Sequence, residues 1–133
     1  MNKKYLAQII ATDNEGLQII SAYTAGAKVR VSDIKYLSSS KVFLLLIERI
    51  KVETNQKFKK INSICRFDFV DNVKSKNINQ KNNELILELI AIDYLKNKNN
   101  YEINLFFKNN SHISLSMETI EVRLEDQSEV KEQ

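Results

Sequence analysis

Apolar and polar residues alternate along most of this 133-residue chain, in six or seven runs separated by short polar stretches. A two-residue period is typical of β-strands with one face in a core and the other in water. The clearest run covers residues 64–70, where apolar and charged side chains take opposite faces: Cys65, Phe67 and Phe69 against Arg66 and Asp68. The pattern predicts a protein built mainly of strands.

Six further segments have the composition of strands: residues 5–11, 28–37, 42–52, 84–95, 101–107 and 112–124. Turns are expected at residues 38–40 and 109–110, with a polar loop at 74–83. The segment at 42–52 begins with six consecutive apolar residues. A strand apolar on both faces belongs in the middle of a sheet.

One helix is predicted after the first strand. The residues from Thr12 to Glu15 match a capping box, in which the threonine oxygen would accept the N3 amide hydrogen. Leu17 and Ile20 then fall on one helical face, and Gly26 is expected just past the helix end, in a left-handed conformation.

The alternation changes parity near Glu118 and Thr119. A β-bulge there would keep both halves of the 112–124 segment facing the core, and a short helix is the competing interpretation. The β-branched residues favour the strand. Residues 125–133 are predicted to be a charged, frayed tail.

Short turns between successive strands favour antiparallel pairing, and curling the sheet would protect its edges. We therefore predict a single α+β domain over residues 1–124. Its mainly antiparallel β-sheet is expected to curl into a barrel or half-barrel, with one N-terminal helix.

The amino-acid composition limits the kinds of catalytic and metal chemistry that the chain could carry out. The chain has one His and one Cys, only two Gly, and no Trp or Pro. A zinc site needs three or four ligands, and no CxxC or HExxH motif is present. Cys65 is predicted on the core face, so a dyad with His112 would require neighbouring strands. We expect no metal and no cofactor, and a catalytic function is less favoured than a non-catalytic one.

No apolar run approaches the ~20 residues that a membrane span needs. The apolar stretch at residues 5–11 is broken by Gln8 and is too short for a signal peptide. The lone cysteine agrees with a reducing compartment. These features predict a cytoplasmic protein with no membrane partner.

Charge is distributed unevenly. Residues 49–81 contain nine Lys or Arg against three acids, whereas residues 118–133 contain six acids against two bases. A basic face can bind nucleic acid, and the best basic-aromatic patch is expected on a loop: Lys57, Phe58, Lys59 and Lys60. Solvated loops rich in Lys and Asn are the simpler explanation.

Arginine and aspartate recur in two similar hairpin-like stretches: Arg30 with Asp33, and Arg66 with Asp68. If the two hairpins pair, the four residues would meet on one surface. Arginine binds carboxylates and phosphates with two parallel hydrogen bonds, so a ligand of that class would bind there. Cross-strand salt bridges on a solvated face are the alternative.

Three stretches carry a family resemblance: A-T-D-x-E-x-L-x-x-I-S-A at residues 11–22, V-R-V-x-D-I-x-Y-L at 29–37, and I-x-L-x-M-E-x-I-E-V-x-L-E-D at 113–126. With them the chain resembles an alphaproteobacterial family catalogued as domain of unknown function 2948. The resemblance implies a cytoplasmic bacterial protein with no established activity.

The residues together predict a small non-catalytic module that binds a protein partner or forms a homo-oligomer. One alternative is an RNA-associated protein that uses the basic middle region. A second is a small-molecule-binding protein or minor enzyme that uses the Arg/Asp surface.

Overall fold

A computed structural model of the chain describes residues 8–52 and 58–130. Its elements, in chain order, are β1 (Gln8–Ala11), α1 (Asn14–Thr24), β2 (Lys28–Arg30), the 3₁₀ turn η1 (Val31–Asp33), β3 (Ile34–Leu37), β4 (Val42–Val52), β5 (Phe58–Phe67), β6 (Val70–Lys76), β7 (Ile86–Lys96), β8 (Tyr101–Phe107), the 3₁₀ turn η2 (Lys108–Asn110), β9 (His112–Met117) and β10 (Val122–Glu129).

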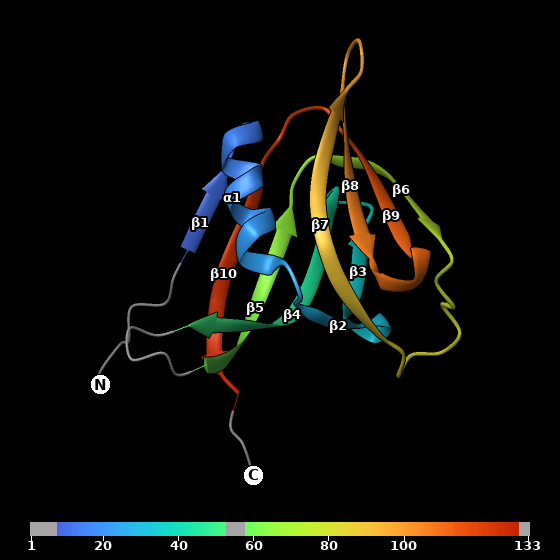
Figure 1. The fold of residues 1–133 in the computed structure, drawn as a ribbon. Helices are drawn as coiled ribbons and strands as arrows, with labels where there is room; N and C mark the ends of the chain where they lie inside the picture. Colours follow the sequence, from blue (N-terminus) through green and yellow to red (C-terminus); the bar gives the residue numbers. More distant parts are fainter. Residues whose placement is uncertain (1–7, 53–57, 131–133) are drawn as a thin grey trace.

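The strands form one antiparallel sheet in the order β1-β10-β5-β4-β2-β7-β8-β9-β6, and β3 pairs separately with β4. The sheet curls around an apolar core without closing into a barrel, and α1 packs across it against β7 and β1 (Figure 1). The predicted α+β class, with a curled antiparallel sheet and one N-terminal helix, is confirmed.

The helix begins one residue later than the capping-box pattern predicted. Asp13 is the N-cap, and its Oδ1 accepts a hydrogen bond from the Gly16 amide at 2.8 Å. Leu17 and Ile20 are buried as expected, and Gly26 follows the helix with φ +84°. A Cβ on Gly16 would lie 3.0 Å from Ala11, so this glycine lets α1 approach β1 closely.

The segment at residues 112–124 is neither a bulged strand nor a strand followed by a helix. β9 pairs with β6 and β8, whereas β10 pairs with β1 and β5. The parity change near Glu118 and Thr119 marks the crossing between two distant parts of the sheet. Each strand sets its own register, so both apolar sets still face the core.

Three other predicted boundaries are wrong. β5 ends at Phe67, and Phe69 lies between strands with φ +60° and a 45% exposed side chain. β6 continues to Lys76 inside the predicted polar loop. Residues 125–129 belong to β10, because they pair with β5 and are not frayed.

Candidate binding cleft between two sheet edges

Two strands of the sheet leave one edge without a strand partner and face each other across a cavity. Within the described residues, β3 pairs only with β4, and β6 only with β9. The cavity between them measures about 560 Å³, and its apolar wall comes from both edges and from the core behind them: Val31, Ile34, Tyr36, Phe43, Val73 and Ile113. It is within the usual range of ligand pockets, roughly 300–1,000 Å³.

Hydrogen bonds link segments on different sides of the cleft. At one end the Tyr36 hydroxyl donates to the Val70 carbonyl oxygen at 2.7 Å, and the Val70 amide donates to the Lys41 carbonyl oxygen at 2.8 Å. Elsewhere in the lining, the Ser32 amide donates to the Asn83 carbonyl oxygen at 3.3 Å. Hydrogen bonds of the native fold thus connect segments that line the cleft.

Local chain geometry explains why β6 does not pair with β3. The register of β6 against β9 shifts between Val70 and Asn72, which bends the strand at its start. Phe69 and Lys41 both have positive φ, at 60° and 58°, so the chain turns sharply on each side of this end of the cleft. The two strands therefore diverge from their contact at Val70.

The rim of the cleft is basic. Lys35 on β3, Lys74 and Lys76 on β6, and Lys81 in the following loop are exposed. None of these four has an ion pair within the described part of the chain. The lysines are therefore available to a negatively charged partner.

Two acids of the surrounding segments are paired with cations outside the rim. Asp71 lies 2.9 Å from the Lys41 ammonium group, and its hydrogen bond and charge raise the pKa of that lysine. Glu84 lies 3.6 Å from Arg30. Within the described residues no acid forms an ion pair with a rim lysine, although Asp33 lies two residues before Lys35 in the chain.

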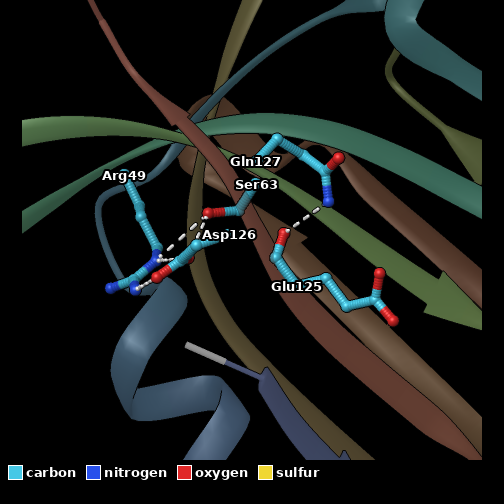
Figure 2. Close-up of polar contacts among 5 residues, drawn as sticks. All are labelled: Arg49, Ser63, Glu125, Asp126 and Gln127. Atoms are coloured by element: carbon cyan, nitrogen blue, oxygen red, sulfur yellow. Dashed lines mark hydrogen bonds and ion pairs between the residues drawn. The ribbon is translucent and has the colours of Figure 1, made fainter. Parts of the chain in front are cut away.

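A buried charged network lies at a different place, beside α1 (Figure 2). Arg49, Ser63 and Asp126 are 5%, 1% and 4% exposed. The Arg49 guanidinium donates to both Asp126 carboxylate oxygens, at 3.0 and 2.6 Å, and the Ser63 hydroxyl donates to Oδ1 at 2.7 Å. The guanidinium also lies 5.8 Å from the centre of the Tyr23 ring on α1.

The network has a structural role, because its charges compensate one another. Burial alone would raise the pKa of Asp126, but the hydrogen bonds from Arg49 and Ser63 outweigh it and hold that pKa below its ordinary value. Figure 2 shows Asp126 pointing toward Arg49, while Glu125 and Gln127 point to the other side of β10.

Sequence reasoning missed this network, although one signal was present. Arg49 has the same parity as Leu45 and Ile47, both of which face the core. Strand alternation alone therefore directs the arginine inward. Its partner cannot be found the same way, because the charged sequence of residues 125–133 predicts a tail.

The four Arg/Asp candidates lie in two separate places. Arg30 ends β2, and together with Asp33 of η1 it lines a second groove of about 730 Å³. Arg66 is on β5, where its Nη2 lies 3.0 Å from the Asp68 carboxylate, outside that groove. β2 pairs with β4 and β7, and β5 pairs with β4 and β10. Arg30 and Arg66 therefore lie on strands that do not pair with each other, and the structure brings together each Arg/Asp pair but not all four residues.

The basic-aromatic patch is in a strand and not on a loop. Lys57 lies outside the described residues, and Phe58, Lys59 and Lys60 begin β5. Lys59 lies 3.0 Å from Glu129, and Lys60 lies 3.8 Å from Glu48. Phe58 is 73% exposed. Both described lysines of this patch are thus neutralised by acids.

Cys65 and His112 are far apart in the fold. Cys65 is in the core, where burial raises the pKa of its thiol to about 12. His112 is on β9, where its Nε2 lies 2.9 Å from the Asn104 amide oxygen and its ring stacks on Phe106. β5 and β9 are not neighbours, so the two residues cannot form a dyad.

Two classes of feature do not occur in the described part of the chain. No cluster of three or more His, Cys, Asp or Glu residues is arranged to hold a metal ion there. No helix among those residues is long and apolar enough to cross a membrane.

The fold and the cleft define a class of protein: a curled antiparallel sheet with a lysine-rimmed apolar cleft between two strand edges. Residues 7–133 match the model of the family described as protein of unknown function DUF2948, and the chain belongs to that family. The sequence resemblance is thereby confirmed. No curated protein and no solved structure matches the chain.

Proposed function

We propose that this chain is a non-catalytic binding module that takes up an extended segment of a protein partner along the edge of β6. The observation that carries the proposal is the pair of strand edges facing each other across an apolar cavity. Such edges expose backbone N–H and C=O groups that pair readily with another chain.

Strand addition is a common way to recognise peptides. Main-chain hydrogen bonds to the edge give affinity, and alternate side chains of the added strand enter pockets that give specificity. β6 offers seven residues for pairing, and Val73 and Ser75 line the cavity beside it. The side chains of an added segment would therefore reach the apolar wall formed by Ile34 and Ile113.

The composition of the cleft favours binding over catalysis. Its lining contains Ser, Lys, Tyr, Gln and Asn side chains but no His, Cys, Asp or Glu. A general base in reach of a nucleophile is the usual requirement for hydrolytic chemistry. The lining has the apolar surface and scattered polar groups of a recognition site.

The test is selection of peptides from a random display library, followed by binding measurements on synthetic copies. Ser75→Trp fills the cleft from an exposed position and is expected to abolish binding. Ser128→Trp, at an exposed position of β10, is the matched control and should bind as the unmodified protein does. Amide hydrogen exchange is expected to slow along β6 when peptide is bound.

Two results would overturn the proposal. One is a library that yields no peptide above background. The other is a set of peptides that bind the Ser75→Trp variant unchanged and leave amide exchange in β6 unaltered.

A further inference from the structure

Positive charge surrounds the proposed binding cleft from both strands. Lys74 and Lys76 alternate along β6 with Val73 and Ser75, which line the cavity. The lysines therefore project from the solvent side of that strand. Lys35 lies at the opposite rim, between Ile34 and Tyr36 on β3, and is itself part of the cavity lining.

We infer that the partner segment alternates apolar and acidic residues, an inference that rests on the proposed function. In an added strand, successive side chains point to opposite faces. One set would enter the apolar cavity, and the other would lie beside Lys35, Lys74 and Lys76. Apolar residues suit the first set, and Asp or Glu suits the second.

Edge lysines also have a protective role, because they discourage strands from pairing without control. Here they stand on both rims of one cleft, so like charges oppose closure of β3 onto β6. An uncharged or basic segment would leave that repulsion in place. An acidic segment neutralises the rim lysines and removes that repulsion. The same lysines thus disfavour uncharged and basic strands and favour acidic ones.

A nucleic acid is the competing polyanion, and the cleft fits it poorly. Binding of single strands relies on aromatic rings on which bases stack. Tyr36 and Phe43 are the aromatic residues in the lining. The Tyr36 hydroxyl is bound to the Val70 carbonyl oxygen, and Phe43 is in the core. The cleft therefore offers a base one half-buried ring, that of Tyr36, because Phe43 is 1% exposed.

The experiment uses three synthetic peptides of equal length. The first alternates Val with Glu, the second alternates Val with Lys, and the third contains the Val and Glu residues of the first in blocks. Each is titrated into the full chain and into two variants with equal loss of charge. One variant carries Lys35→Gln, Lys74→Gln and Lys76→Gln. The control carries Lys28→Gln, Lys51→Gln and Lys98→Gln, all exposed and outside the cavity lining.

We expect the Val/Glu peptide alone to bind well, and added salt to weaken it. The rim variant should lose about tenfold in affinity, the loss expected when three exposed ion pairs are removed. The control variant should lose far less. Ser75→Trp should abolish binding of the same peptide.

The outcomes separate this inference from the proposed function. Library peptides that are sensitive to Ser75→Trp but carry no acidic residues would overturn the acidic preference and leave the proposed function standing. Equal loss of affinity in the rim and control variants would also overturn the acidic preference and leave the proposed function standing. Displacement of the peptide by single-stranded RNA, with direct RNA binding at the rim lysines, would also overturn the inference.

Discussion

Removal of Asp126 tests the role of the buried network directly. In Asp126→Ala the Arg49 guanidinium stays in a site where it is only 5% exposed, with the Ser63 hydroxyl as its remaining close polar partner. Breaking a buried ion pair by deleting one member costs about 3–5 kcal/mol, since the other charge is left uncompensated. Proteins of this size are commonly stable by ~5–15 kcal/mol, so the loss is large but measurable.

Two further variants separate charge from packing. Arg49→Met combined with Asp126→Leu removes both charges and keeps much of the volume, so the double variant is expected to recover most of the lost stability. Lys108→Ala breaks an exposed 3.0 Å ion pair with Glu88 and should cost about 0–1 kcal/mol.

Urea denaturation gives the free energy of unfolding for each variant by linear extrapolation. The chain has no Trp, so circular dichroism is the suitable signal. A loss in Asp126→Ala no greater than that in Lys108→Ala would refute the reasoning. A double variant as unstable as Asp126→Ala would assign the loss to packing and not to the unpaired charge.

Three further predictions concern pH, reactivity and close packing. Because the pKa of Asp126 lies below its ordinary value of 3.8, its ion pair should stabilise the fold fully above that pH and progressively less as pH falls through the lowered pKa. Acid titration of Asp126→Asn should lack that part of the loss, and curves of equal steepness for both proteins would contradict this. Burial raises the pKa of Cys65 to about 12, so iodoacetamide should alkylate it slowly in the native protein and rapidly in urea, as read by mass spectrometry; rapid native labelling would contradict it. Gly16→Ala should lower the stability measured by thermal denaturation, because the new Cβ would lie 3.0 Å from Ala11. A gain in stability near the ~1 kcal/mol that Ala contributes over Gly in a helix would contradict this and show that β1 shifts to make room.

The parts of the fold that the sequence predicted well are those where local pattern and burial agree. β8 has the predicted bounds, Tyr101–Phe107, because its alternation runs between clear polar breaks. The apolar run that begins β4 is flanked by β5 on one edge and by β2 and β3 on the other. The central position agrees with what an unbroken apolar run indicates, but only one face of the run is fully buried, because Leu44 is half-buried and Leu46 is 40% exposed.

The parts of the fold that could not be predicted depend on pairing between strands that are far apart in the sequence. A change of parity near Glu118 is compatible with a bulge, a helix or a crossing, and only the partners of β9 and β10 distinguish them. Asp126 appeared solvated because its neighbours are charged. Its partner Arg49 is 77 residues away in the sequence, so no local pattern could reveal the pair.

The binding cleft could not be predicted from local sequence either. Ile34 and Val73 look like ordinary core positions in the sequence, and the lysines beside them look like solvated surface. They become a binding surface because the unpaired edges of β3 and β6 lie on opposite sides of the same cavity, which is a property of the whole pairing order. Charge counted along the chain pointed to residues 49–81 as one basic region. The fold divides that region: Lys59 and Lys60 are paired with acids, while the β6 lysines stay unpaired beside Lys35, which lies outside the counted region.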